Sequence, residues 1–315
     1  MTIRSFGNSL ATFKYRFGRT GKEASGSPPP PELPFSASGG TVTTPGNGYT
    51  YHTYSSTGTD TFVVNSGSKD IELLVVAGGG GAGDYRCSGA GAGGLIYYGP
   101  QPTTSTAGAS FPVTTGTYNI RVGAGGPGGN SNTSTDGTPS YFGPVVATGG
   151  GAGRLGPAGN PGGSGGGWGV DSAPQPYTTA GSGVPGQGFP GGGTGSVGGG
   201  GNTGGGGGAG ARGGDGSGTT GGDGGDGLQF PTFTGPLIGL PALNPLNGYF
   251  AGGGAGAAGP SNFGFFGGTG GAGGGGTGNQ AGVTNSGGGA ASGYPQTATT
   301  PRAGGPGIVV VRYLT

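Results

Sequence analysis

The segment GSVGGGGNTGGGGGAGARGGDG, residues Gly195–Gly216, carries almost no side chains. Glycine loses more conformational freedom on folding than any other residue, so ordering such a segment is costly. The segment is therefore either a disordered tether or a structure that exploits the absence of Cβ atoms. The rest of the chain has to distinguish these two possibilities.

The whole chain shares this composition. Of its 315 residues, 94 are glycine and 26 are proline, whereas 7% are charged and 29% are hydrophobic. The apolar residues suffice for one small core, comparable to that of a domain of about 100 residues. A net charge of +1 gives the chain as a whole no reason to bind nucleic acid or anionic lipid. One cysteine and one histidine exclude a disulfide framework within the chain and leave almost no room for a Cys or His metal site.

Three zones follow one another along the sequence. We predict an N-terminal arm over residues 1–39, a β domain over 40–125 and a glycine-rich zone over 126–306. The β domain holds short β-branched or aromatic runs, such as YTYHTY and IELLVVA, between turn residues. No segment shows a helical period, so we expect a mainly β protein with essentially no α-helix. We also expect no secretory signal and no membrane insertion, because no apolar run has the required length.

The C-terminal residues GIVVVRYLT return to a strand pattern. Ile308–Val311 and Leu73–Val76 are continuous apolar runs, which suit strands covered on both faces. We predict that these runs are neighbours in an antiparallel base, which the strand at 308–313 completes. The glycine-rich zone is then a long excursion whose two ends are tied to the same sheet.

Polyglycine II helices explain how this excursion can be ordered. They have about three residues per turn and no internal hydrogen bonds, so their N–H and C=O groups point outward. Without Cβ atoms, several such helices can approach closely and hydrogen-bond to one another. We predict a bundle with Gly204–Gly208 at its packed centre and Asn202, Arg212 and Asp215 facing outward at its rim.

Collagen and disorder are the alternatives for the glycine-rich zone. The triplets of GRLGPAGNPG fit collagen over a few turns only, because the segment around Trp168 interrupts them. Low charge, apolar islands and the closing strand argue against disorder. The polyglycine II bundle is therefore the favoured interpretation.

Several segments resemble a known family. GGTVTTPGNGYTYHTYSSTGTDTFVV, IELLVVAGGGGAG, YNIRVGAGGPGGN, YFGPVVATGGGAG and GGPGIVVVRY resemble, in order and spacing, the glycine-rich domain family of tailed-phage virion proteins, common in cyanophage-like genomes. The resemblance covers about Gly39 to Tyr313. The glycine-rich part is also similar to tail-fibre tip adhesins, whose polyglycine II helices pack as a sandwich and whose loops contact the host receptor.

This resemblance implies a non-enzymatic virion protein on the tail or the particle surface. A tail-fibre, fibre-tip or baseplate-associated protein is the first interpretation, and a capsid decoration or head-fibre protein is the alternative. The expected partners are other virion proteins and a glycan or protein on the host cell surface. Fibres are commonly trimers, whereas a polyglycine bundle can form within one chain, so both states stay open.

Apolar islands interrupt the glycine runs. If these runs form rods, the islands are turns at the rod ends, where large side chains suit the binding of a glycan or protein surface. The alternative is that the islands bury their own surface and cap the bundle. The candidate receptor-binding residues are Trp168, Tyr177, Phe189, Phe230, Phe233, Leu237, Tyr249 and Phe250.

The arm alternates aromatic and basic residues in the segment TFKYRFGR. A strand with this pattern has one aromatic and one cationic face, and we interpret it as an edge strand that docks onto another virion protein. A solvated tail, or stacking onto single-stranded nucleic acid, are the alternatives. A stiff spacer follows at Pro28–Pro31. The candidate attachment residues are Phe13, Lys14, Tyr15, Arg16 and Phe17.

The remaining motifs do not support catalysis, a metal or a cofactor. GGDGGDGLQ matches one calcium-binding nonapeptide with Asp226 as a ligand, but such motifs work in tandem and the preceding residues do not repeat it. Dinucleotide-type glycine triplets lack the helix that must follow them. We interpret His52 as an ordinary strand residue and Cys87 as a small loop residue. The expectation is a protein without enzymatic activity, metal or cofactor.

Overall fold

The computed structural model describes residues 33–84, 86–130, 133–156, 159–170, 179–193, 202–217, 220–258, 267–293 and 302–315. A compact unit spans Phe35–Thr315, so it begins at Phe35 rather than at the predicted residue 40. The attachment candidates Phe13 to Phe17, the proline spacer and Tyr177 lie outside the described residues.

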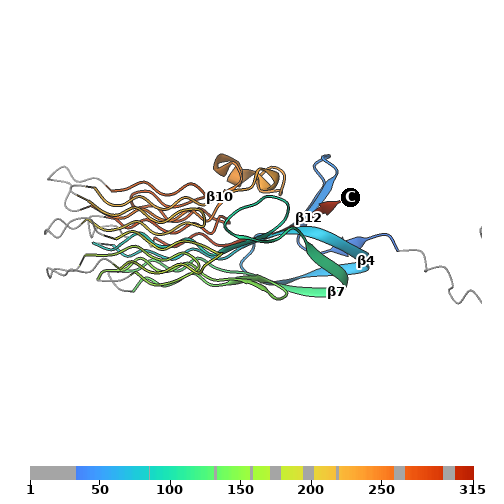
Figure 1. The fold of residues 1–315 in the computed structure, drawn as a ribbon, viewed down its shortest axis with the longest axis horizontal. Helices are drawn as coiled ribbons and strands as arrows, with labels where there is room; N and C mark the ends of the chain where they lie inside the picture. The colour runs from blue at the N-terminus through green and yellow to red at the C-terminus, as the bar shows by residue number, and fades with distance from the viewer. Residues whose placement is uncertain are drawn as a thin grey trace, which may run out of the picture. The chain divides into compact units, whose positions relative to one another are not determined.

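The described chain is mainly β and contains no α-helix, as predicted (Figure 1). Its large sheet consists of β1 (Ser36–Ser38), β2 (Thr41–Thr43), β3 (Tyr49–Tyr54), β4 (Gly58–Val76), β5 (Leu95–Tyr98), β6 (Thr106–Gly108), β7 (Phe111–Val122), β8 (Ser140–Phe142), β9 (Val145–Ala147) and β12 (Ile308–Leu314). A separate hairpin pairs β10 (Leu228–Gln229) with β11 (Tyr249–Phe250). The 3-10 turns η1 (Pro231–Phe233) and η2 (Pro241–Leu246) lie between its strands.

The C-terminal strand occupies the middle of the sheet. The hydrogen-bonded order is β2-β3-β12-β4-β7-β8-β9, with antiparallel neighbours throughout this path. Ile308 pairs with Val76 and Val311 with Leu73, which confirms the predicted neighbours. Because β12 lies between β3 and β4, the sheet is incomplete until the last residues of the chain are in place.

One apolar core lies between the two halves of the long strand β4. Phe62 and Val64 from its first half share this core with Leu73 and Val75 from its second half. The ladder with β7 shifts register between Val64 and Ser68, where two glycines allow both strands to bend. The sheet therefore wraps around this core.

A second apolar core lies on the other face of β12 and the neighbouring strands. The island 228–250 covers this face with its own large side chains. The buried members of this cluster are Tyr51, Leu74, Val76, Ala92, Leu95, Tyr97, Ala209, Phe230, Phe233, Ile238, Leu243, Phe250, Ala251, Ile308 and Val310.

The glycine-rich runs form a polyglycine II bundle beside the sheet (Figure 1), and we call each run a rod. In the rod 77–83, the N–H groups from Ala77 to Ala82 donate to three neighbouring rods in rotation, and that of Gly83 donates to Gly153 of a fourth rod. A partner that recurs every third residue is the pattern of a helix with about three residues per turn. This confirms the predicted bundle. The acceptor carbonyls, in order from Ala77 to Ala82, belong to Gly94, Thr138, Gly305, Gly91, Thr135 and Arg302.

Sheet and bundle alternate along the chain. The rods 77–83 and 88–94 belong to the bundle although they precede residue 125, whereas β8 and β9 belong to the sheet although they follow it. The predicted division at residue 125 therefore does not separate two structures. The reason is that β4, β7 and β9 each lead directly into a rod.

The rods pack backbone against backbone. A Cβ atom added to Gly206 would overlap the carbonyl oxygen of Ala90. No residue of Gly204–Gly208 has a positive φ, so close approach rather than backbone angle requires glycine here. These residues are buried and both Arg212 and Asp215 are exposed, as predicted.

Asn202 is buried, which contradicts its predicted place at the rim. The adjacent Thr203 donates its N–H to Ala257 and accepts at its carbonyl from Gly222. Its hydroxyl lies 2.8 Å from the Cys87 carbonyl. Other rods therefore surround this rod on several sides, and position 202 has no outward face.

Aspartates complete the hydrogen bonding at the rim of the bundle. Asp223 accepts the N–H of Thr269 at 2.6 Å, and Asp226 accepts that of Ala272 at 2.8 Å. The two carboxylates are one helical turn apart, so both face the same rod. The carboxylate of Asp226, the residue of the calcium-like motif, thus accepts a hydrogen bond that a backbone carbonyl accepts elsewhere in the bundle.

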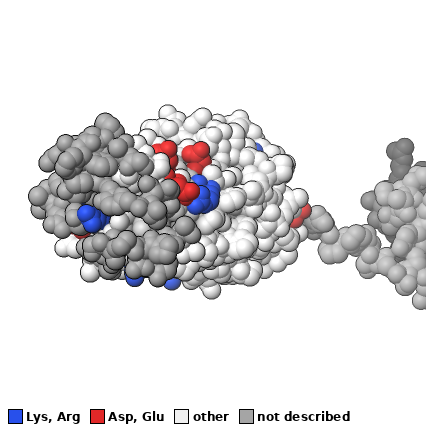
Figure 2. Space-filling model, turned by 60° about the vertical axis from the view of Figure 1, so that its left-hand side comes forward, with Lys and Arg blue, Asp and Glu red and all other residues white. Residues whose placement is uncertain are grey.

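Two further aspartates act in the same way. Asp136 accepts from the N–H of Ala152, and Asp215 from that of Gly193. The hydrogen bond from Arg212 holds the pKa of Asp215 below its usual value. Charged residues make up only 7% of the chain. On the face shown in Figure 2, several acidic side chains lie together beside basic ones.

Candidate functional site: the free end of the glycine bundle

The rods run away from the sheet and back to it, so the bundle has a sheet end and a free end (Figure 1). The rod 77–83 continues β4 outward, and the rod 88–94 leads back into β5. Their hydrogen bonds run antiparallel, from Ala77 to Gly94 and from Gly80 to Gly91. The rods 123–129 and 133–138 repeat this course between β7 and β8.

Later rods follow the same course without returning to the sheet each time. The outward rod 188–193 pairs with the returning rod 202–209 through Gly192 to Gly205, and 251–258 pairs with 267–273 through Gly271 to Gly253. The last outward rod ends at Gly293, and Arg302 begins the rod that returns to β12. The described ends of the outward rods and the described beginnings of the returning rods thus lie at the same end of the bundle.

Three predicted receptor-binding residues lie at the opposite end. Phe230, Phe233 and Phe250 are each at most 1% exposed and belong to the island that covers the sheet. The ring of Tyr97 lies 4.7 Å from that of Phe230 and 6.2 Å from that of Phe233. These three do not lie on exposed rod-end turns and instead fit the alternative interpretation, in which the islands bury their own surface, because burial against the sheet removes their apolar surface from water.

The other predicted residues are scattered. Leu237 and Tyr249 are half-buried on the same island, where the Thr43 hydroxyl donates to the Leu237 carbonyl at 2.8 Å. Phe189 is half-buried near the sheet end. Trp168 lies on an outward rod toward the free end but is 6% exposed, which contradicts its predicted exposure, because the rods 188–193 and 202–209 flank it.

Buried polar groups occupy the described part of the free end. Arg302 is 3% exposed, and its Nη1 donates to the Gly83 carbonyl at 3.2 Å. The Ser292 hydroxyl reaches the same oxygen at 3.3 Å. Burial lowers the pKa of Arg302, and the carboxylate of Asp84 opposes this effect.

Cys87 lies in the same region and is fully buried. Burial and the nearby Asp84 raise the pKa of the thiol to about 12. The thiol is therefore protonated at neutral pH and is a poor nucleophile. Around this buried centre, Arg86 and Arg154 are half-exposed, and Arg154 donates to the Ser134 carbonyl at 3.1 Å.

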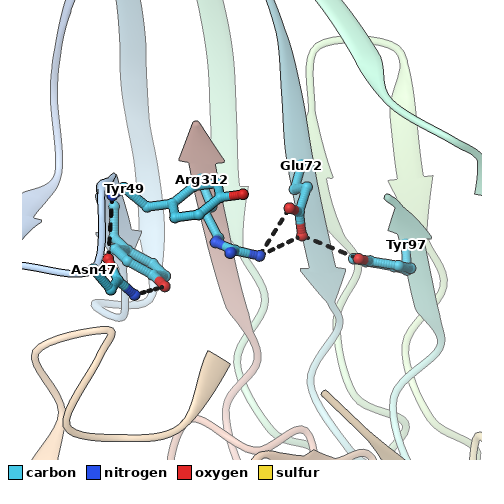
Figure 3. A network of polar contacts seen from close by, with 6 residues as sticks. Asn47, Tyr49, Glu72, Tyr97 and Arg312 are labelled. Carbon is cyan, nitrogen blue, oxygen red and sulfur yellow. Dashed lines mark hydrogen bonds and ion pairs between the residues drawn. The ribbon is translucent and has the colours of Figure 1, made fainter. Parts of the chain in front are cut away.

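A polar network lies on the sheet (Figure 3). Nη1 of Arg312 donates to both carboxylate oxygens of Glu72, at 2.8 and 2.9 Å, and the Tyr97 hydroxyl donates to Glu72 at 3.1 Å. The guanidinium also lies 3.6 Å above the ring of Tyr49. Burial, followed by the Glu72 carboxylate, raises the pKa of Tyr97. This network is structural, because the two charged side chains are only 9% and 14% exposed.

Sequence reasoning missed this network, although the sequence contains a signal for it. Glu72 directly precedes one of the two apolar runs predicted to pair, and Arg312 directly follows the other. In the observed register these two residues are direct partners. Opposite charges in two paired strands therefore could have predicted the ion pair.

His52 is a buried strand residue, as predicted. Its Nδ1 lies 2.8 Å from the Gly39 carbonyl and its Nε2 lies 3.0 Å from the Tyr313 hydroxyl. Burial lowers the pKa of the imidazole. Within the described ranges, no group of three His, Cys, Asp or Glu side chains could hold a metal ion. No helix there is long and apolar enough to cross a membrane.

Comparison with known proteins places this architecture in a family. A family model described as a glycine-rich domain matches residues 53–314. The chain belongs to this glycine-rich domain family. The matched residues run from β3 to β12 and include every described rod, so the family feature is sheet and bundle together. Among curated proteins, the chain has no significant match.

Proposed function

We propose that this glycine-rich domain protein is a non-enzymatic phage virion component that presents host-binding groups at the free end of its bundle. The observation that carries the proposal is that the described outward rods end, and the returning rods begin, at one end of a scaffold whose other end is fixed to a sheet. Binding residues commonly lie on loops that a rigid scaffold positions. A tail-fibre, fibre-tip or baseplate-associated position fits this arrangement.

The bundle is held rigid by its backbone rather than by side chains. Each rod is hydrogen-bonded to several neighbours, and a Cβ at most rod glycines would overlap backbone atoms. The scaffold therefore resists deformation while leaving the connecting segments free to vary in sequence. Such a division suits a surface that must change with its receptor. A host glycan or surface protein is the proposed partner.

The N-terminal arm has the complementary role in this proposal. The compact unit begins at Phe35, and the alternating segment Phe13–Phe17 precedes it. We assign this segment to attachment on another virion protein by strand addition.

The experiment blocks one end of the bundle at a time in the full-length chain. A biotin-acceptor peptide is inserted between Ser217 and Thr220 at the free end. The matched control carries the same insertion at the exposed sheet-end turn between Pro185 and Gln187, where Gln187 accepts from Leu95 of β5. Binding of each labelled protein to susceptible cells is then measured with and without streptavidin.

We expect streptavidin to abolish cell binding for the free-end insertion and to spare it for the control. Equal binding in both cases, or no binding of the unmodified chain to susceptible cells, would contradict receptor presentation. Imaging the labelled chain on the virion distinguishes the tail position from the alternative, a capsid decoration or head-fibre protein. Tail and head proteins differ in their position on the particle and in copy number.

A further inference from the structure

Three arginines surround the end of the outward rod 77–83, at the free end of the bundle. This rod donates N–H groups to the carbonyl of Arg302 on one side and to the segment that leads into Arg154 on another. Arg86 lies in the connection that follows the rod, and the returning rod begins where Ser88 donates its N–H to the Arg154 carbonyl. The three arginines therefore stand on neighbouring segments, although two of them are far from the third in sequence.

These side chains have more hydrogen-bond donors than the surrounding rods have acceptors for them. Nη1 of Arg302 donates to the Gly83 carbonyl, and Nη2 of Arg154 donates to the Ser134 carbonyl. Within the described ranges, the buried Nε of Arg154, the buried Nε and Nη2 of Arg302 and the buried Nε1 of Trp168 have no hydrogen-bond partner. Buried N–H groups without acceptors are destabilising and rare, so several of them at one end of the bundle indicate that a ligand supplies acceptors there.

The carboxylates of this region do not balance its positive charge. The negative charge of Asp84 opposes the effect of burial on the pKa of Arg302. Asp136 uses its Oδ1 to accept both the Ala152 N–H, at 2.7 Å, and the carboxamide of Asn160, at 2.8 Å. Two carboxylates therefore face three guanidinium groups among the described residues around this rod end, which leaves a net positive charge.

An oxyanion meets both requirements, acceptor atoms and negative charge. A guanidinium group presents its N–H donors in one plane and can bind a carboxylate or phosphate through two parallel hydrogen bonds. Arg86 and Arg154 are half-exposed, so an external ligand can reach them. Arg302 is 3% exposed, so its charge is weakly screened and adds to the attraction. A neutral glycan would leave this charge without a counterion.

We propose that the free end recognises an oxyanion, a carboxylate, phosphate or sulfate, on a host surface glycan through Arg86 and Arg154. This inference rests on the proposed function, because it names the chemistry of the receptor for the same end of the bundle. Nucleic acid fits less well, because binding a strand takes a series of basic groups along a groove, whereas these arginines surround a single rod end.

The test measures binding of the full-length protein to immobilised polysaccharides by biolayer interferometry. The probes are polygalacturonate, dextran sulfate and phosphorylated dextran, with neutral dextran and duplex DNA as comparisons. The variants are Arg86→Gln and Arg154→Gln. The matched control is Arg121→Gln, which removes the same charge from a half-exposed arginine on β7 in the sheet. Thermal melts establish that each variant is folded.

We expect binding to at least one anionic polysaccharide and none to neutral dextran, and the probe that binds identifies the oxyanion. The affinity should fall about tenfold in each free-end variant, stay unchanged in the control and weaken with added salt. Binding to no anionic polysaccharide, equal affinity in wild type and free-end variants, an equal loss in the control, or tighter binding of duplex DNA would each overturn the proposal.

Cell binding separates this inference from the proposed function. If streptavidin at the free end blocks cell binding but both arginine variants bind cells as the wild type does, the oxyanion proposal fails and receptor presentation stands. If both variants lose polysaccharide binding as expected but streptavidin spares cell binding, the oxyanion site stands and receptor presentation fails.

Discussion

At the residue scale, glycine here is a packing residue. A position that accepts only glycine commonly has a positive φ. The central rod residues Gly204–Gly208 have no positive φ, and glycine is required there because a Cβ atom would overlap the backbone of a neighbouring rod. At the rim of the bundle, by contrast, side chains take part in the hydrogen bonding between rods. There, aspartate side chains supply acceptors that a further rod would have supplied.

Replacing Gly206 with Val should separate the neighbouring rods, because its Cβ would overlap the Ala90 carbonyl. We expect a loss of about 3 kcal/mol in the free energy of unfolding, the upper range for overpacking. Thermal denaturation and limited proteolysis measure the effect. The matched control is Gly267→Val, where an added Cβ would be 3.7 Å from the nearest atom, the Gly256 carbonyl oxygen. Equal stability of the two variants would contradict backbone packing.

Asp226→Ala should remove the acceptor of the Ala272 N–H at the rim. By analogy with lost helix caps, we expect a loss of about 1 kcal/mol in the free energy of unfolding. Asp226→Asn is the control, because its amide oxygen can still accept this hydrogen bond. Chemical denaturation compares the two variants. Equal losses in the two variants would indicate that the charge, which both lack, matters rather than the hydrogen bond.

At the element scale, β12 joins the beginning and the end of the fold. It pairs with both β3 and β4, and its alternate residues enter two different cores. A strand with both faces buried accepts no charged side chain without a partner, and Arg312 is tolerated because Glu72 pairs with it.

Val310→Asp should therefore prevent stable folding, because Val310 is fully buried in the second apolar core, beneath the island 228–250. We expect a loss of more than about 4 kcal/mol in the free energy of unfolding. Leu314→Asp on the same strand is the control, since Leu314 is 57% exposed, and its effect should stay within about 0.5 kcal/mol. Circular dichroism and melting curves of both variants test this. A folded Val310→Asp protein would contradict the central position of β12.

At the scale of the whole molecule, the compact unit is built by repeated passes between sheet and free end. Most contacts join residues that are distant in sequence, as in the pairing of β3 with β12. Such a fold closes only after its C-terminal strand is made, so we expect slow folding.

Deletion of residues 1–32 should leave this unit folded, because the compact unit begins at Phe35. We expect an unchanged melting temperature and, under the proposed function, loss of incorporation into virions. Calorimetry and quantitative analysis of purified particles measure the two outcomes. Normal incorporation of the truncated chain would exclude the arm as the attachment segment. Unfolding would show instead that the arm is part of the folded unit.

The sequence by itself determined the elements with the strongest local pattern. The apolar runs Leu73–Val76 and Ile308–Val311 can be stable only with both faces covered, which predicted their pairing. The glycine runs have no side chains to bury, which left packing through backbone hydrogen bonds as the ordered solution. Asp215 and Arg212 at the rim also followed from this argument.

Only the tertiary structure decided which surfaces stay exposed. Phe230, Phe233 and Phe250 look like loop anchors in sequence, but the open face of the sheet buries them. Asn202 is enclosed because rods distant in sequence surround it. Burial depends on contacts between segments far apart along the chain, and no local pattern encodes them.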